Sequence, residues 1–453
     1  MLELVIGLLV AAGVGRYIFK GYTATGVLLT GGIILLAITA ALGKDVLPAG
    51  VTSTGNPLTD VFEYIKYLLM YRAGGLGMMI MMLCGFAAYM TKIGANDMVV
   101  MMASRPLRFI KSPYVLMVAT YFVACLMSLA VSSATGLGVL LMATLFPLMV
   151  NMGISRGAAA AICASPAAII LSPTSGDVVV AAESAGMELI DFAFKTTLPI
   201  SIVAIIGMAA AHFFWQRYLD DKEGVVHERL DVSELEVNAP KFFCILPFTP
   251  IIGVLLFSGK LFPQLHIVTI LVICMFLAAI IELVRHRGES SKVFDGLDAA
   301  YKGMADAFSG VVMLLISAGV FAQGLKSVGF IDNLLHLAEV AGAGGIFLMI
   351  LLVAITAIAA ITTGSGNAPF YAFVELIPSL AAKMGINPAY LVIPMLQASN
   401  LGRTISPVSG VVVACSGMAK LSPFEVVKRT SVPVLVGIVI VIVATQIMVP
   451  TAV

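Results

Sequence analysis

Apolar stretches of about 20 residues, the length an α-helix needs to cross a lipid bilayer, recur along the whole chain. Short connections separate them, apart from one hydrophilic segment near the middle, residues 217–241. Of the 453 residues 60% are apolar and 11% charged, against roughly 25% charged in soluble domains. The stretches do not alternate polar and apolar residues as strands of an outer-membrane barrel do. The sequence therefore predicts an all-α polytopic membrane protein.

The apolar runs predict both continuous and interrupted helices. Continuous helices are expected near residues 2–19, 24–43, 75–94, 197–216, 243–259, 265–284, 306–326 and 430–449. Two longer segments, 114–152 and 343–383, are predicted as paired helical legs with a polar tip. Two others, 156–190 and 388–418, are predicted as broken helices.

Basic residues indicate which side of the membrane each connection faces. Most of the 26 lysines and arginines fall in connections on one side, including those of the central hydrophilic segment. Positively charged connections tend to stay in the cytoplasm, so both termini are predicted to lie outside. Arg403 is the exception, because this topology places it inside the membrane and in neither aqueous phase.

The two halves of the chain also resemble each other. SPTSG at 172–176 corresponds to SPVSG at 406–410, and other matches keep the same order through most of each half. The predicted topology begins the first half outside the membrane and the second half inside. We therefore expect two inverted-topology repeats, 1–216 and 243–453, joined by a cytoplasmic linker, 217–242.

Polar interruptions occur at equivalent positions in both halves. SSATG (132–136) and TTGSGN (362–367) lie at the tips of paired legs, whereas SPTSGD (172–177) and NLGRTISPVSG (400–410) break helices. Backbone groups freed by proline and glycine must be buried in protein or line a wet cavity. Helix N-termini there suit anions, and carbonyl and hydroxyl oxygens suit a cation such as Na⁺. Close packing of small residues in lipid is the structural alternative.

Two charged residues fall in the breaks, Asp177 in the first and Arg403 in the second. A guanidinium suits a carboxylate, so a small carboxylate anion is the predicted ligand, and a salt bridge between the two residues is the structural alternative. The predicted substrate-binding residues are Arg403, Ser133, Thr135, Thr363, Ser365, Asn367, Asn400, Thr404 and Ser406. The predicted ion-coupling residues are Asp177, Ser172, Thr174 and Ser175. Glu183, Glu188, Asp306 and Glu375, nearer to helix ends or on faces left unassigned, are predicted to be interfacial.

Other classes of function find little support in the residues. Serines near Asp177 lack a histidine or lysine base, and no spacing typical of a metal site occurs, so we expect neither an enzyme nor a metal site. The net charge of +1 does not favour a nucleic-acid partner. A channel is the stronger rival to a carrier, because broken helices also line ion filters.

Five segments are similar to the anaerobic C4-dicarboxylate transporter family of the DcuC type. They are GMMIMMLCGFAAYMTKIGANDMVV, LAVSSATGLGVLLMATLFP, ISRGAAAAICASPAAIILSPTSGDVV, TTGSGNAPFYAFVELIP and MLQASNLGRTISPVSGVVVA. The resemblance runs over nearly the whole chain. It implies a multi-pass carrier of the bacterial inner membrane for succinate, fumarate and malate, acting in succinate efflux or in exchange, by antiport or symport. Both termini would then be periplasmic.

The resemblance also implies an architecture: a scaffold domain that can form a homodimer, and a transport domain built from two re-entrant hairpins and two broken helices. Sodium-coupled dicarboxylate carriers of this architecture have Ser-Asn-Thr at both hairpin tips, whereas the tips here contain SSATG and TTGSGN. This difference leaves a proton, carried by Asp177, and Na⁺ as alternative coupling ions, and no cofactor is implied. A channel, or a carrier for another small organic anion, is the alternative function.

Overall fold

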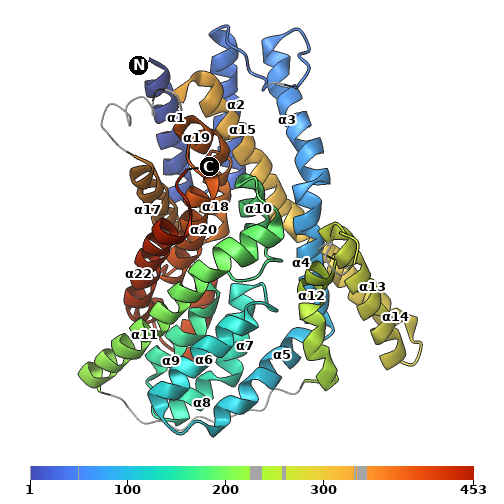
Figure 1. Ribbon diagram of the computed structural model, residues 1–453, viewed down its shortest axis with the longest axis vertical. Helices are drawn as coiled ribbons and strands as arrows, with labels where there is room; N and C mark the ends of the chain where they lie inside the picture. The colour runs from blue at the N-terminus through green and yellow to red at the C-terminus, as the bar shows by residue number, and fades with distance from the viewer. Residues whose placement is uncertain are drawn as a thin grey trace.

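The structure is a bundle of α-helices, as the sequence predicts (Figure 1). The computed structural model describes residues 2–48, 50–224, 237–257, 262–330, 333 and 344–452. Six continuous helices in these ranges are long and apolar enough to cross a bilayer. A bent pair, Pro57–Gly74 and Leu76–Lys92, makes a seventh if it is counted as one span with a 44° bend. The prediction of an all-helical membrane protein with several spans is thereby confirmed.

The helices of the first half are α1 (Leu2–Phe19), α2 (Ala24–Ala41), α3 (Pro57–Gly74), α4 (Leu76–Lys92), α5 (Ala95–Ser104), α6 (Pro113–Met127), α7 (Ala134–Thr144), α8 (Phe146–Asn151), α9 (Arg156–Ala164), α10 (Gly176–Ser184) and α11 (Leu198–Glu223). Those of the second half are α12 (Thr249–Leu256), α13 (Ile267–Arg285), α14 (Ser290–Ala307), α15 (Met313–Val328), α17 (Gly345–Thr363), α18 (Asn367–Val374), α19 (Ile377–Met384), α20 (Pro388–Thr404), α21 (Gly410–Ala419) and α22 (Pro423–Met448). A π-helical turn, Phe308–Val312, joins α14 to α15.

Three helices were not predicted, namely α3, α5 and α14. α3 carries Asp60, Glu63, Lys66 and Arg72, and α14 carries Lys292, Asp295, Asp298, Lys302 and Asp306. These charges lower the average hydropathy of both helices. Each helix nevertheless keeps one buried face, which in α3 consists mainly of Val61, Tyr64 and Leu68 at helical spacing. A search for uniformly apolar runs misses such amphipathic helices, because their burial follows the 3.6-residue period.

The helix predicted at 197–216 extends further than expected. α11 continues to Glu223, so the first residues of the segment predicted as a linker, 217–242, are helical. Helical geometry persists there because Arg429 of α22 binds acidic side chains on that last turn of α11. Residues 225–236 lie outside the described ranges, and the division into repeats at 216 and 243 stays a prediction.

Glycines allow the long helices to pack closely. A methyl group placed on Gly32 of α2 would lie 2.7 Å from the backbone nitrogen of Phe321 in α15. A methyl group on Gly85 of α4 would lie 2.9 Å from the carbonyl oxygen of Ala300 in α14. Such close approach favours helix association in lipid, where van der Waals contact replaces the hydrophobic effect. The pairs α2–α15 and α4–α14 therefore form tightly packed supports beside the site described below.

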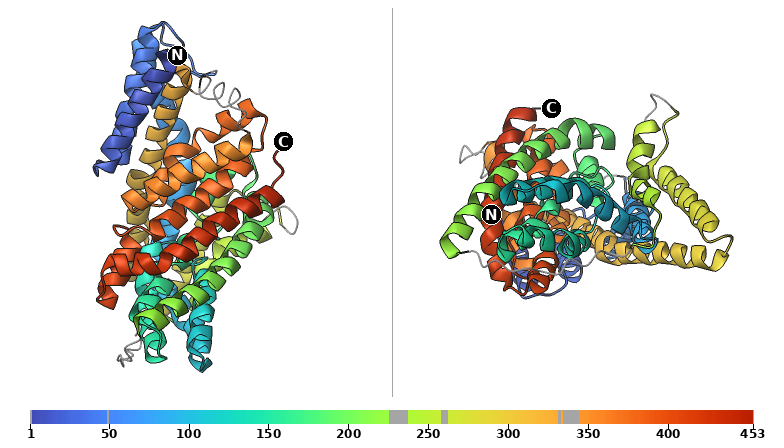
Figure 2. Two further views of the ribbon diagram at one scale, coloured as in Figure 1. Left: turned by 90° about the vertical axis from the view of Figure 1, so that its left-hand side faces the viewer. Right: turned by 90° about the horizontal axis from the view of Figure 1, so that it is seen from below.

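The polar interruptions fall where the sequence predicts them. α6 and α7 are separated by a tip at 128–133, and α17 and α18 by a tip at 364–366. The broken helices are α9 with α10 and α20 with α21. Figure 1 shows α6 and α7 in the lower half of the molecule and α17 and α18 in the upper half. Figure 2 shows the connected ends of α13 and α14 projecting to one side of the molecule, whereas α14 packs along α4.

Candidate functional site

A cavity of about 300 Å³ lies where the interruptions meet, at the lower end of the range for small-molecule sites. Its polar side chains come from four places. They are the tip between α6 and α7 (the first hairpin), the segment between α9 and α10 with the start of α10 (the first helix break), the start of α18 and the end of α20. α4 and one residue before α15 supply an apolar wall. The lining residues are Ile80, Leu83, Cys84, Ala87, Ser132, Ser133, Ala134, Thr135, Ile170, Thr174, Ser175, Gly176, Asp177, Val311, Asn367, Tyr371 and Arg403.

Arg403 lies at the end of α20 and is the basic residue of this lining. Its Nη2 donates to the carbonyl oxygen of Ala167, 2.9 Å away, in the first helix break. Its Nε is buried without a hydrogen-bond partner. No carboxylate oxygen of a described residue, Asp177 included, lies within 4.0 Å of its guanidinium nitrogens. The alternative of a direct salt bridge with Asp177 is therefore not formed, and the guanidinium keeps donors for a ligand.

Asp177 lies in the first turn of α10 and is 4% exposed. The hydroxyl of Tyr371 in α18 donates to its Oδ1, and Nδ2 of Asn400 in α20 lies 3.4 Å from its Oδ2. Its carboxylate thus joins the first helix break to the second hairpin and the second broken helix. Both partners are neutral, so the carboxyl group can hold or release a proton without losing a fixed counter-ion.

Three helices begin at the cavity, since Ala134, Gly176 and Asn367 are the first residues of α7, α10 and α18 and all line it. The N-terminal turn of a helix has unpaired N–H groups and a partial positive charge. Ser133 caps α7 by accepting from the backbone nitrogen of Gly136 at 3.1 Å, and its hydroxyl proton stays available. Arg403 and these helix ends suit an anion, whereas Asp177, in the first turn of α10, is an acidic group of the same lining.

The tip between α17 and α18 (the second hairpin) packs against α20 and α21 (the second broken helix). A methyl group on Gly366 would lie 2.6 Å from Oδ1 of Asn400 and 3.0 Å from Cδ of Arg403. Gly364 has a positive φ of 73°, and a methyl group there would lie 2.9 Å from the backbone nitrogen of Ser409. Two glycines therefore let this tip lie directly on the segment that carries Arg403.

The structure brings only part of the predicted set to the cavity. Ser133, Thr135, Asn367 and Arg403 line it, together with Asp177, Thr174 and Ser175. Ser172 adjoins it and shares a hydrogen bond with Thr174 at 2.9 Å. Asn400 acts through Asp177, as described above. The hydroxyls of Thr363, Ser365, Thr404 and Ser406 instead bind backbone groups of their own segments.

Sequence reasoning missed Tyr371 and Gln397. Tyr371 follows Asn367 by four residues on α18, and this spacing places both on one helical face, which was a usable signal. Gln397 is a polar residue inside the apolar run of α20, where it binds the backbone of Ile170. It lies outside the cavity lining, and nothing in its local sequence indicates its partner.

The acidic residues predicted to be interfacial are partly paired. Arg72, at the end of α3, donates to Glu183 at 2.6 Å and to Glu375 at 2.7 Å. These contacts connect α3 with the end of α10 and with the residue after α18. One arginine thus pairs with two glutamates that are distant in the sequence, beside a larger, mostly apolar cavity of about 530 Å³.

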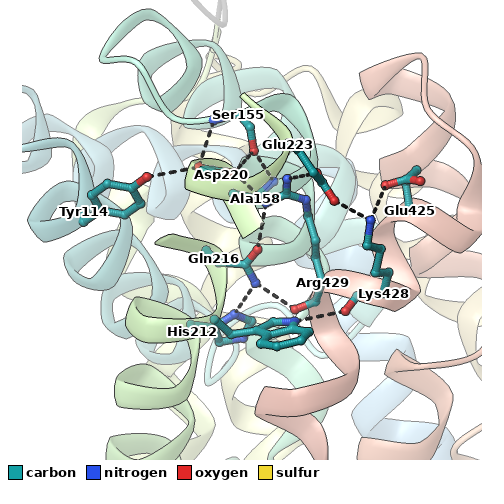
Figure 3. A network of polar contacts seen from close by, with 11 residues as sticks. Tyr114, Ser155, Ala158, His212, Gln216, Asp220, Glu223, Glu425, Lys428 and Arg429 are labelled. Atoms are coloured by element: carbon teal, nitrogen blue, oxygen red, sulfur yellow. Dashed lines mark hydrogen bonds and ion pairs between the residues drawn. The ribbon is translucent and has the colours of Figure 1, made fainter. Parts of the chain in front are cut away.

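A second polar network joins the ends of four helices away from the cavity (Figure 3). Arg429 of α22 is 3% exposed and donates to Asp220 at 2.6 Å and to Glu223 at 2.7 Å. Asp220 also accepts from Ser155, the N-cap of α9, at 2.5 Å and from Tyr114 of α6 at 3.3 Å. Because Arg429, Ser155 and Tyr114 all donate to the carboxylate of Asp220, this network holds the ends of these helices together.

Comparisons with known proteins agree with the family resemblance. The DcuC family model, described as a C4-dicarboxylate anaerobic carrier, matches residues 2–450. The anaerobic C4-dicarboxylate transporter DcuC of Escherichia coli (strain K12) is 72% identical over 449 residues, which cover 99% of this chain and 97% of that protein. The probable anaerobic C4-dicarboxylate transporter DcuC of Vibrio cholerae is 66% identical over 452 residues, 99% of this chain and 98% of that protein.

Two solved structures share the fold at low sequence identity. The YdaH transporter of Alcanivorax borkumensis aligns with a TM-score of 0.64 and 17% identity, covering 93% of this chain and 97% of that one. MtrF of Neisseria gonorrhoeae aligns with a TM-score of 0.57 and 15% identity, covering 92% and 94%. The match of the family model over nearly the full length, with the high identity of the bacterial relatives, shows that the chain belongs to the DcuC family of anaerobic C4-dicarboxylate transporters, a family of membrane transporters and not of enzymes.

Proposed function

We propose that the chain carries C4-dicarboxylates such as succinate, fumarate and malate across the bacterial inner membrane by alternating access, in succinate efflux or exchange. Membership of the family supports the class of substrate. The single observation that carries the site is Arg403, whose guanidinium lines the cavity with a buried Nε left unpaired and with no acidic partner within 4.0 Å among the described residues.

The cavity suits a molecule with a carboxylate at each end. One carboxylate binds the planar guanidinium of Arg403, which can donate two parallel hydrogen bonds. The second binds the hydroxyls of Ser133 and Thr135 and the N-terminus of α7, where backbone N–H groups favour negative charge. The apolar wall from α4 then contacts the methylene groups between the two carboxylates.

The two halves act as inverted repeats in this proposal. The order of elements is the same in both halves, which supports the repeat. Each half has a helix pair that is bent (α3–α4) or joined by a π-helical turn (α14–α15), then a hairpin, a broken helix and a long helix. The hairpins and broken helices form the transport domain with α11 and α22, and α1–α4 with α12–α15 form the scaffold, which can pair as a homodimer. Both termini lie in the periplasm.

Coupling is assigned to Asp177. It sits in the cavity between neutral partners, Tyr371 and Asn400, where a proton or a cation can neutralise it. Ser172, Thr174 and Ser175 supply oxygen atoms beside it for a cation. Neutralising Asp177 changes the net charge of the cavity, and this links its occupancy to the binding of a dianion.

Counterflow in proteoliposomes tests the proposal. Unlabelled succinate inside the vesicles should accelerate uptake of labelled succinate from outside, because a carrier returns to the outward-facing state faster when loaded. Butyrate has the same chain length and only one carboxylate, so it should not replace internal succinate. Uptake that does not respond to internal succinate would indicate a channel, and equal acceleration by butyrate would indicate a carrier for other organic anions.

A further inference from the structure

Gln397 occupies an unusual position for a polar side chain. It lies in the apolar middle of α20, is fully buried and does not line the cavity. Its Oε1 accepts from the backbone nitrogen of Ile170 at 2.9 Å, and its Nε2 donates to the carbonyl oxygen of Ile170 at 3.1 Å. Nε2 also lies 3.3 Å from the hydroxyl of Ser201 in α11. Both of its polar atoms therefore bind Ile170, and Ser201 supports the same residue with a longer bond of 3.5 Å to its carbonyl oxygen.

Ile170 belongs to the unwound segment between α9 and α10, after the short 3₁₀ turn Pro166–Ala168. Its backbone groups have no helical partners there, and leaving them unpaired in a buried place would be costly. A side-chain amide can both donate to and accept from one residue, as a neighbouring β-strand would. Gln397 thereby replaces the backbone hydrogen bonds that the helix break removes.

The same unwound segment is held by α20 at a second point. Three residues before Ile170, the carbonyl oxygen of Ala167 accepts from Arg403. Ile170 itself lines the cavity, as do Thr174 and Asp177 further along. The position of this segment against α20 therefore decides both where the guanidinium of Arg403 points and where the carboxylate of Asp177 lies.

We infer that Gln397 is a positioning residue for substrate binding: by clamping the backbone of Ile170, it sets the unwound segment so that Arg403 faces the cavity with free donors. The inference rests on the proposed function. Gln397 acts through Ile170 and Ala167, and the substrate does not contact it.

Gln397→Glu and the neutral Gln397→Met together test this role, because only the first adds a charge that could repel the dianion. A glutamate side chain has nearly the same shape and accepts from the nitrogen of Ile170. When ionised it cannot donate to the carbonyl oxygen of Ile170, whereas a protonated carboxyl group makes both bonds. In the variant, both hydrogen bonds to Ile170 therefore form only when this carboxyl group is protonated.

Succinate affinity of purified, full-length wild type and variant is measured at about pH 8 and about pH 6, a range that reaches the raised pKa expected of a buried carboxyl group. The ratio of the two dissociation constants at each pH removes the titration of succinate. It also removes contributions that both proteins share, such as those of Arg403 on α20, Asp177 on α10 and His212 on α11. We expect the variant to bind at least roughly tenfold more weakly at the higher pH and to approach the wild type at the lower pH.

Gln323→Glu is the matched control. Gln323 lies in α15 and donates to the carbonyl oxygen of Val46 at 3.0 Å, away from the cavity. Its variant should show no pH dependence of the affinity ratio. Gln397→Met is measured beside it and should bind succinate more weakly than the wild type at both pH values, because it removes both bonds to Ile170 without adding a charge. It also decides the matter if Gln397→Glu does not fold, as judged by its melting temperature without succinate.

The outcomes distinguish a failure of the positioning role of Gln397 from a failure of the proposed transport function. An affinity ratio for Gln397→Glu that is independent of pH, or unchanged affinity in Gln397→Met, would overturn the positioning role while leaving the transporter assignment intact. A wild-type protein that does not bind succinate at all would overturn the proposed function, and the inference with it.

Discussion

Replacing Arg403 with lysine tests the central residue of the site. Lysine keeps the positive charge but offers a single ammonium group in place of the planar guanidinium. In the wild type, Nη2 holds the carbonyl of Ala167 and the remaining donors stay available. A lysine that binds Ala167 turns its ammonium away from the cavity, and one that faces the cavity leaves Ala167 unpaired. The variant therefore loses at least one hydrogen bond of the charged side chain, either to Ala167 or to the carboxylate of the substrate.

The size of the effect follows from that bond. A hydrogen bond to a charged group contributes about 1.5–3 kcal/mol. This free energy corresponds to roughly 10- to 150-fold in the dissociation constant for succinate, at about 1.4 kcal/mol per factor of ten. At a succinate concentration about 100 times the wild-type dissociation constant, binding adds about 2.7 kcal/mol to the free energy of unfolding. A variant with about 100-fold weaker binding is then half saturated and gains about 0.4 kcal/mol.

Thermal unfolding of the purified proteins with and without succinate measures this difference. The wild type should show a clear rise in melting temperature, and Arg403→Lys almost none at the same concentration. Arg217→Lys is the control, because Arg217 is exposed near the end of α11, away from the cavity, and it should be protected like the wild type. Equal protection of Arg403→Lys would refute the assignment of Arg403 to the substrate and leave the helix N-termini as the anion site.

Three further variants test the surroundings of the cavity and the fold. Gly366→Ala places a methyl group 2.6 Å from Oδ1 of Asn400, so it should lower the free energy of unfolding by the about 1–3 kcal/mol typical of overpacking. Gly417→Ala, with open space around it, should not, and equal stabilities in denaturant unfolding would contradict the tight packing of the second hairpin. Asp177→Asn should abolish accumulation driven by a proton or sodium gradient and keep some counterflow, and accumulation at the wild-type level would make Asp177 structural. Asp220→Asn leaves Glu223 as the one ion-pair partner of the buried Arg429 and should lower the free energy of unfolding by about 3 kcal/mol. Asp221 is exposed, so Asp221→Asn should change this free energy little. Equal effects of the two variants in denaturant unfolding would show that the network in Figure 3 contributes little to stability.

The sequence by itself determined the spans and their interruptions. Apolar runs near bilayer length mark most of the long helices, and the two broken helices and two paired legs occur where serine, threonine, glycine and proline interrupt those runs. These features are local, because hydropathy and the helix-breaking effect of proline and glycine act within a few residues. For the same reason Arg403 and Asp177 could be recognised as unusual from their position alone.

The amphipathic helices needed more than local composition. α3 and α14 carry charges at intervals along their length, and the burial of their apolar residues depends on the neighbours against which each helix packs. The pairing of Arg72 with Glu183 and Glu375 likewise depends on how α3 docks against α10 and α18. The sequence shows these charges, and only the packed structure shows that they pair with one another.

Only the tertiary structure decided which polar groups form the site. Tyr371 meets Asp177 and Gln397 meets Ile170 across distances of about 200 residues in the chain, and no sequence period encodes such contacts. The hydroxyls of Thr363 and Ser133 look alike in sequence, yet one binds its own helix and the other lines the cavity. Side-chain direction at a helix break depends on the backbone dihedral angles there, and the packing of the two halves against each other sets those angles.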